Sequence, residues 1–318
     1  MSGKKTVLLL FILVLIAGFY YFKVRTTSSG GSFSSLSREA ARARVLPLES
    51  GETIEHLTLK DRLKETEISL RSVSDHVWQI EQPVRYSAES PVVDGLASLL
   101  KLTPRSRPLS MEGSQESELG FDSPRLEICV ATTKKAEERC LLIGLDAAVV
   151  QGGYAKWEDE STYFLVNSNF LKAFDKTLYS LRKKQIFDLL SQEIVEIQFQ
   201  SEGKERFLKR QGKNWVLSKL KEIGLSADSV DTLMTLLNGL YVKEFLDGRR
   251  WADSEFGLNS NPKFIRIVFG DGSEQTLMWG AEAPGLDAYY AVGPEDKTLL
   301  LVSRGKINQA VEKFGSFS

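Results

Sequence analysis

The sequence predicts an α+β fold in which an N-terminal transmembrane helix precedes two tandem repeats of an antiparallel sheet-plus-helix domain. Three features predict it: an uncharged apolar run at residues 6–22, sequence matches that recur about 137 residues apart, and alternating apolar residues joined by tight turns. With 318 residues the chain is long enough for two domains. Its composition, 42% hydrophobic and 26% charged, is that of an ordinary globular protein.

Charge and rare residue types exclude several classes of protein. The 41 Lys and Arg residues nearly balance the 42 Asp and Glu residues, so no overall positive field exists to attract nucleic acid. The two cysteines and two histidines do not have the spacing of metal ligands. We therefore expect no nucleic-acid partner, no metal and no cofactor.

The apolar run at residues 6–22 is the candidate membrane anchor. As a helix its 17 residues would extend about 25 Å, slightly less than a hydrocarbon core of about 30 Å. Aromatic residues end the run and basic residues flank it: Tyr20, Tyr21, Phe22, Lys4, Lys5, Lys23 and Arg25. A cleaved signal peptide is the alternative, but bulky rings stand where small residues should precede a cleavage site.

The domain organisation follows from this anchor. We expect a membrane anchor with a short cytoplasmic start at residues 1–22 and a Ser/Gly-rich linker at 23–51. Two repeat domains follow, at 52–188 and 189–318. The flanking positive charges are nearly balanced, but a body that follows a first hydrophobic segment is the usual plan of an exported domain. A cytosolic body on a membrane tail is the alternative.

The internal repeat consists of matches in the same order at nearly one offset. They are Trp78 with Trp215, residues 90–100 with 228–237, 118–121 with 255–258, 141–144 with 277–280, and 54–59 with 195–199. In the second copy, residues 264–269 and 274–279 flank an Asp-Gly turn and predict a β-hairpin. Strands joined by tight turns, with few helices, indicate an antiparallel α+β domain.

These residues resemble the family known as domain of unknown function 4340. The resemblance is carried by W-x-L at 215–217, the helical motif at 227–237, F-G-L at 256–258, W-G at 279–280 and Y-Y at 289–290. The first copy fits more loosely, and the two copies together cover residues 52–318. The resemblance implies a single-pass protein of the bacterial inner membrane, mostly periplasmic. Some members resemble auxiliary components of gliding-motility-type ABC transporters, and the family supplies no catalytic residues.

A tryptophan and an aspartate recur in both copies, and we expect both to be structural. Trp78 and Trp215 are expected to be core indoles whose N–H groups find backbone partners, and Asp94 and Asp231 to lie on solvated helix faces. No catalytic, cofactor-binding or metal-binding residue is predicted.

Four arginines occupy nearly corresponding places between a helix and a glycine turn in the two copies. They are Arg105, Arg107, Arg249 and Arg250. We interpret them as candidate contacts to a partner protein or to anionic lipid, with a solvated charged face as the alternative.

Cys129 and Cys140 are the only cysteines. Alternation in the flanking strands places both thiols on the same face of one hairpin, and a turn at residues 134–135 would set them opposite each other. In an oxidising envelope this predicts a disulfide. The second copy has Val268 and Thr276 at these places, so the shared fold does not require the bond.

The sequence thus favours a non-enzymatic, membrane-anchored envelope protein, an accessory or scaffold component of an inner-membrane complex of ABC type. Its partners would be the membrane, through the N-terminal helix, and a protein of that complex. The alternative is a periplasmic ligand-binding module for a glycan, peptide or lipid. An enzyme would require acids or histidines clustered across the two copies.

Overall fold

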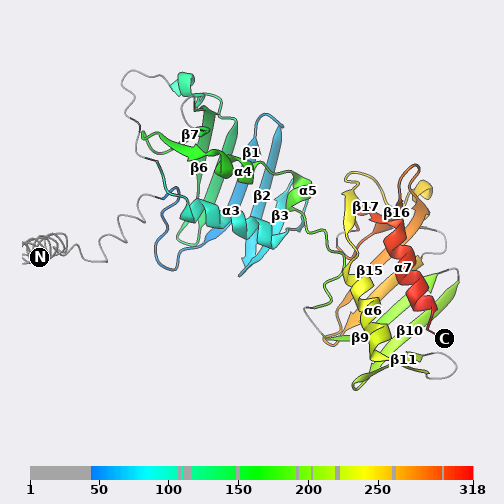
Figure 1. The fold of residues 1–318 in the computed structure, drawn as a ribbon. Coiled ribbons are helices and arrows are strands. Elements are labelled where there is room, and N and C mark those ends of the chain that lie inside the picture. Colours follow the sequence, from blue (N-terminus) through cyan, green and yellow to red (C-terminus); the bar gives the residue numbers. More distant parts are fainter. Residues whose placement is uncertain are drawn as a thin grey trace, which may run out of the picture.

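The computed structural model describes residues 44–106, 109, 116–147, 151–190, 193–201, 203–218, 223–259, 263–295 and 297–317. Figure 1 shows two units, each an antiparallel sheet with helices. The predicted anchor at residues 6–22 and most of the predicted linker lie outside the described residues. Among the residues that are described, no helix is long and apolar enough to cross a membrane.

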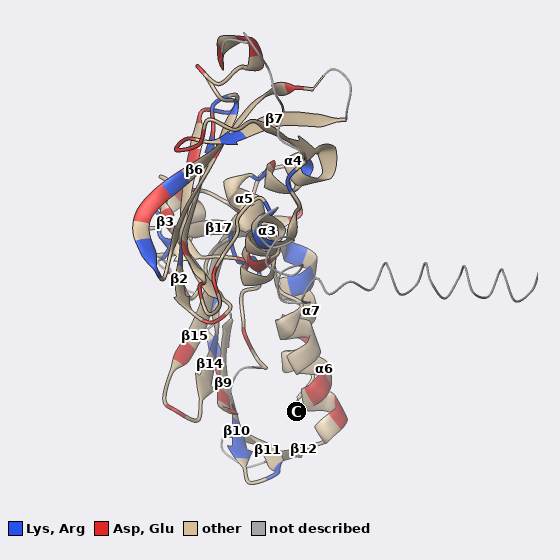
Figure 2. Ribbon diagram, turned by 90° about the vertical axis from the view of Figure 1, so that its left-hand side faces the viewer, with Lys and Arg blue, Asp and Glu red and all other residues tan. Residues whose placement is uncertain are grey.

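The first unit contains an eight-stranded sheet in the order β4-β3-β2-β1-β5-β6-β7-β8. Its elements are β1 (Ile54–Asp61), β2 (Thr66–Ser74), β3 (Val77–Gln82), β4 (Tyr86–Ser87), α3 (Ser90–Leu102), η1 (Glu116–Leu119), β5 (Leu126–Thr132), β6 (Lys135–Asp146), β7 (Gly152–Trp157), β8 (Phe164–Asn167), α4 (Ser168–Phe174) and α5 (Leu178–Leu181). Figure 2 shows the strands on one side and α3 and α4 on the other, so the helices cover one face.

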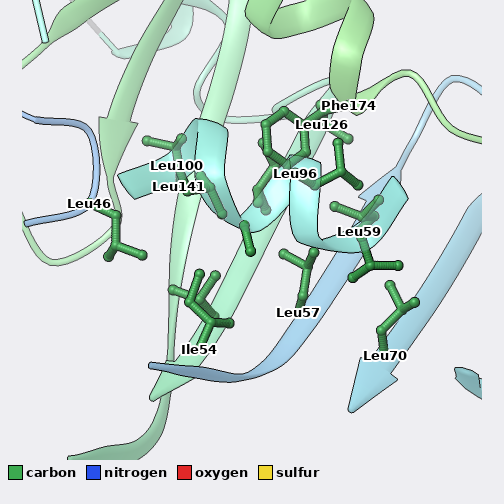
Figure 3. Packing of buried hydrophobic residues seen from close by; sticks show 14 of the residues in the cluster. Leu46, Ile54, Leu57, Leu59, Leu70, Leu96, Leu100, Leu126, Leu141 and Phe174 are labelled. Atoms are coloured by element: carbon green, nitrogen blue, oxygen red, sulfur yellow. The ribbon is translucent and has the colours of Figure 1, made fainter. Parts of the chain in front are cut away.

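The core of the first unit lies between that face and α3. Leu96 and Leu100 come from one face of the helix and contact inward residues of the strands, including Leu57, Leu70 and Leu141 (Figure 3). Each buried leucine of this kind stabilises the fold by about 1.5–3 kcal/mol relative to an exposed one. Buried residues recur about every 3.6 residues in α3, which favours a helix there. In the strands they alternate, which favours an extended chain.

The second unit contains a nine-stranded sheet in the order β12-β11-β10-β9-β14-β15-β16-β17-β13. Its elements are β9 (Ile194–Ser201), β10 (Lys204–Gln211), β11 (Asn214–Ser218), β12 (Ile223–Leu225), α6 (Ala227–Asn238), β13 (Val242–Phe245), η2 (Ser254–Phe256), β14 (Lys263–Phe269), β15 (Glu274–Glu282), β16 (Ala288–Val292), β17 (Leu299–Ser303) and α7 (Arg304–Gly315). In Figure 2, α6 and α7 again lie on one side of the strands.

The two sheets have the same strand order, because β9–β12 and β14–β17 follow the pattern of β1–β4 and β5–β8. Strand β13 is additional and extends the second sheet beside β17. The two tryptophans matched in the sequence lie in equivalent strands, Trp78 in β3 and Trp215 in β11.

The matched glycines also occupy equivalent places. Gly120 (φ 80°) follows η1 and Gly257 (φ 66°) follows η2, so each has the left-handed conformation that glycine adopts without strain. A Cβ on Gly144 would lie 2.0 Å from the carbonyl oxygen of Leu119, while one on Gly280 would lie 2.1 Å from that of Phe256. A side chain at either position would displace the 3-10 turn above it.

The cores of the two units include residues that precede the expected domain limits. Val45 and Leu46 are buried in the first core, so the first unit begins before residue 52. Ile186 and Phe187 are buried in the second core, so the second unit begins before residue 189. Both segments are short apolar stretches beside charged ones, and they have no helical or strand period that would reveal their burial.

Candidate functional site

Each unit brings a tryptophan from its third strand and an aspartate from its first long helix into one region. We call Trp78 with Asp94 the first Trp–Asp pair and Trp215 with Asp231 the second. The strands β3 and β11 supply the tryptophans, and the helices α3 and α6 supply the aspartates.

The first Trp–Asp pair is closed, which means that its two side chains are hydrogen-bonded to each other. The indole Nε1 of Trp78 donates to Asp94 Oδ1 at 2.8 Å, and Nδ1 of His76 lies 2.8 Å from Asp94 Oδ2. The backbone N–H of Trp78 donates to Ser90 Oγ at 3.0 Å. Both carboxylate oxygens of Asp94 are thus used within the unit, and Trp78 is only 4% exposed. The expectation of a backbone partner for this indole was therefore wrong, and Asp94, whose side chain is 30% exposed, is partly solvated rather than free.

The second Trp–Asp pair is open, which means that its two side chains are not hydrogen-bonded to each other. Trp215 is only partly buried, and no hydrogen bond or ion pair joins its Nε1 or the Asp231 carboxylate to another group among the described residues. Both residues line a pocket of about 560 Å³. The full lining is Leu189, Leu190, Glu193, Ile194, Arg210, Lys213, Asn214, Trp215, Leu225, Ala227, Asp231, Met234, Thr235 and Asn238.

The charges in this pocket balance. Arg210 pairs with Glu193, with Nη1 and Oε1 3.0 Å apart. Lys213 and Asp231 are the other two charged residues of the lining, one of each sign. The lining thus combines apolar side chains with indole N–H, ammonium and carboxylate groups, which can hold a ligand with hydrogen-bond donors and acceptors.

A further pocket of about 640 Å³ lies at one end of the first sheet. All of its charged groups except Lys172 are paired within the unit: Lys64 with Asp61 and Asp175, and Arg125 with Asp146. Such pairing leaves fewer free groups for a ligand than the pocket of the second unit has.

Cys129 and Cys140 form a disulfide. They lie directly opposite each other in the β5–β6 hairpin, which is the register that the alternation predicted. Val268 and Thr276 were expected at the equivalent places of the second unit. They do not pair, because Thr276 lies opposite Arg266. The conclusion that the shared fold does not require the bond is unaffected, since an Arg–Thr pair takes its place.

Arg105 connects the first residues of the first unit to its sheet through hydrogen bonds. Its Nε and Nη2 donate to the carbonyl oxygens of Arg44 (3.0 Å) and Val45 (3.2 Å), and its Nη1 donates to Glu160 Oε2 at 2.6 Å. Burial alone would raise the pKa of Glu160, but hydrogen bonds from Arg105 and Arg139 outweigh it and lower that pKa. All three donor groups of Arg105 are thus used inside the unit.

The other candidate arginines are placed differently. Arg107 lies outside the described residues. Arg249 is 69% exposed with a 4.0 Å ion pair to Glu255, and Arg250 is exposed beside it. Arg105 belongs to the first unit and the Arg249–Arg250 pair to the second.

Sequence reasoning missed Arg182, which lies between the two units. Arg182 follows α5 and is 1% exposed, and its Nη1 donates to both carboxylate oxygens of Asp247 at 2.9 and 2.8 Å. The guanidinium carbon lies 4.4 Å from the ring centroid of Tyr86 and 3.9 Å from that of Phe245. We call these four residues the junction, because Tyr86 belongs to the first sheet and Phe245 and Asp247 to the second unit.

Two further hydrogen bonds cross beside the junction. The backbone N–H of Ser87 donates to Glu295 Oε2 at 3.1 Å, and the hydroxyl of Tyr179 donates to the carbonyl oxygen of Val242 at 3.3 Å. In the sequence Arg182 begins a basic run with Lys183 and Lys184, and such a run usually indicates a solvated surface. A single buried arginine leaves no periodic signal.

A metal centre has no support in this part of the chain. Within the described residues, no group of three or more His, Cys, Asp and Glu side chains is arranged to hold a metal ion.

Residues 78–254 match the family described as Domain of unknown function (DUF4340). The chain belongs to this family. The DUF4340 match covers more than half of the 318 residues and runs once from β3 of the first unit to the start of η2 in the second, so it contains all four junction residues. No curated protein and no solved structure matches the chain.

Proposed function

We propose that this DUF4340 protein is a non-enzymatic, membrane-anchored envelope protein that serves as an accessory or scaffold component of an inner-membrane complex of ABC type. Residues 6–22 would form its single membrane span, with the two units in the periplasm of a bacterium. The observation that carries the proposal is the junction, because the buried guanidinium of Arg182, its partner Asp247 and two aromatic rings join two similar units into one body. Such a body offers two sets of surfaces from one chain.

The internal pairing of acidic groups supports a structural role over a catalytic one. Asp94 is held by Trp78 and His76, and Glu160 accepts from Arg105 and Arg139. A general acid or base must be within reach of a substrate proton. Carboxylates held by neighbouring side chains are poorly placed for that role.

We also propose that the two units are copies of one ancestral unit and that the family's domain occurs twice. The shared strand order and the equivalent tryptophan and glycine positions support this. The DUF4340 match itself runs once, through parts of both units.

Affinity purification of the full chain from bacterial membranes in mild detergent tests the scaffold role. We expect a transporter ATPase and its membrane-spanning partner to co-purify in fixed proportion. A control protein carrying residues 1–51 fused to an unrelated domain should recover neither. Equal recovery by that control, or no transporter subunit with the full chain, would exclude the proposal.

The alternative function, a periplasmic ligand-binding module, is favoured by one observation. The second Trp–Asp pair is open and lines a pocket of about 560 Å³, within the range of ordinary ligand sites of about 300–1,000 Å³.

A further inference from the structure

We propose that the pocket of the second unit binds a neutral saccharide, with Asp231 and Trp215 as its principal contacts. This inference rests on the alternative function proposed above. It is independent of any contact with a transporter.

The contrast between the two Trp–Asp pairs carries the inference. In the first unit, donor and acceptor meet each other directly at 2.8 Å and the indole is buried. In the second unit, the same two residue types at equivalent places bond neither to each other nor to any other described residue. Asp231 is exposed and Trp215 is half-buried, so the carboxylate and the indole N–H are both accessible in the pocket, and we infer that a ligand can take the place of the internal bond.

The differences around the pairs follow from the sequence. Ser90, whose hydroxyl accepts the Trp78 backbone N–H, is replaced by Ala227, which has no acceptor. His76, which lies 2.8 Å from Asp94, is replaced by Lys213, which makes no ion pair with Asp231. The groups that close the first pair are therefore missing from the second.

The ligand must satisfy three demands at once. It must donate to the Asp231 carboxylate, accept from the Trp215 indole or the Lys213 ammonium, and cover apolar surface formed by residues such as Leu225 and Met234. A sugar ring meets all three, since its hydroxyls both donate and accept and its axial C–H groups form an apolar face. Asn214, also in the lining, adds an amide that can donate and accept.

Charge selects a neutral ligand over an ionic one. The lining contains two acidic and two basic residues, Glu193, Asp231, Arg210 and Lys213, and one of each sign is already paired. A strongly anionic or cationic ligand would therefore meet one like charge for each opposite one. A volume of about 560 Å³ suits a ligand of one or two sugar rings.

The test uses the full chain in a detergent without a sugar headgroup. The probes are maltose, cellobiose, N,N′-diacetylchitobiose and, as a different class, the peptide amide Ala-Leu-Ala, with binding measured by calorimetry and by saturation-transfer NMR. We expect at least one disaccharide to bind. We expect Asp231→Ala and Trp215→Leu each to weaken it at least tenfold.

The first unit provides the matched control. Asp94→Ala removes the equivalent carboxylate, and it should leave disaccharide affinity within twofold of the unaltered chain even if the first unit is destabilised. Because the Asp231 side chain makes no internal bond, Asp231→Ala should keep the circular dichroism spectrum unchanged, and it decides the question if Trp215→Leu fails to fold.

Three outcomes would overturn the inference: no disaccharide binds, binding survives Asp231→Ala, or the peptide binds in place of the sugars. These failures are distinct from failure of the scaffold role, which is judged by co-purification of transporter subunits alone.

Discussion

Arg182 carries a positive charge into the contact between the two units. Placing a guanidinium away from water costs several kcal/mol unless its charge is balanced. Both carboxylate oxygens of Asp247 accept from Nη1, and the rings of Tyr86 and Phe245 lie close enough for cation–π attraction. The buried charge is therefore tolerated only while both units keep their positions.

The two partners of this ion pair should respond unequally to substitution. Asp247→Ala leaves a buried guanidinium without its anion, and we expect it to lower the free energy of unfolding by about 3–5 kcal/mol. Arg182→Met leaves a carboxylate whose side chain is 37% exposed and can be hydrated, so the loss should be smaller, about 1–3 kcal/mol. Urea unfolding followed by tryptophan fluorescence measures both.

Arg249→Met is the matched control for the junction variants. Its ion pair is 4.0 Å long and exposed, so the change should stay within about 0.5 kcal/mol. If Asp247→Ala were no more destabilising than Arg249→Met, the junction would not be what joins the units.

The wrong or missing predictions for single residues share one cause. The sequence placed Asp94 on its helix and Trp78 in its strand correctly, but it could not show that the two meet. Arg182 was missed because its ion-pair partner, Asp247, lies in the second unit, 65 residues further along the chain. A hydrogen bond between distant segments leaves no period and no spacing, whereas the position of each residue in its own element does.

At the scale of elements, strands with strong alternation were predicted well. The hairpin of β14 and β15 turns at Asp271 and Gly272, as the Asp-Gly signal predicted. Strands β4 and β12 were missed because two or three residues are too few to display a period of two. The segment 45–46 was assigned to the linker for the same reason, although its residues are in the core.

The β5–β6 hairpin should depend on its disulfide. The bond closes a loop with a sequence separation of 11, which stabilises the folded state by about 2–3 kcal/mol through chain entropy. Adding a reductant should lower the urea midpoint of the unaltered protein by a corresponding amount. The double variant Cys129→Ala with Cys140→Ala should have the lower midpoint from the start and show no response to reductant.

Alkylation gives an independent reading of the same bond. Protein purified without reductant should expose no reactive thiol until it is denatured and reduced. Two thiols that react freely before reduction, together with a midpoint that reductant does not change, would contradict a disulfide in the purified protein.

At the scale of the whole molecule, the orientation of the chain determines which compartment the two units occupy. The basic residues flanking residues 6–22 are nearly balanced, so charge alone does not decide it. The disulfide supplies a second argument, because such bonds persist in oxidising compartments and are rare in the cytosol. Both the position of the apolar run and the disulfide favour an exported body.

Protease added to spheroplasts tests this orientation. We expect cleavage within residues 26–37, where the sequence is rich in Ser and Gly, and release of a fragment that contains both units while a cytosolic marker stays intact. The packed units should resist longer than the linker, because a protease needs an accessible, unpaired backbone. The Cys129–Cys140 pair, trapped by alkylation in the same cells, should be oxidised. If the full chain resisted the protease until the spheroplasts were lysed, and both thiols were trapped in the reduced state, the units would lie in the cytosol and the periplasmic assignment would fail.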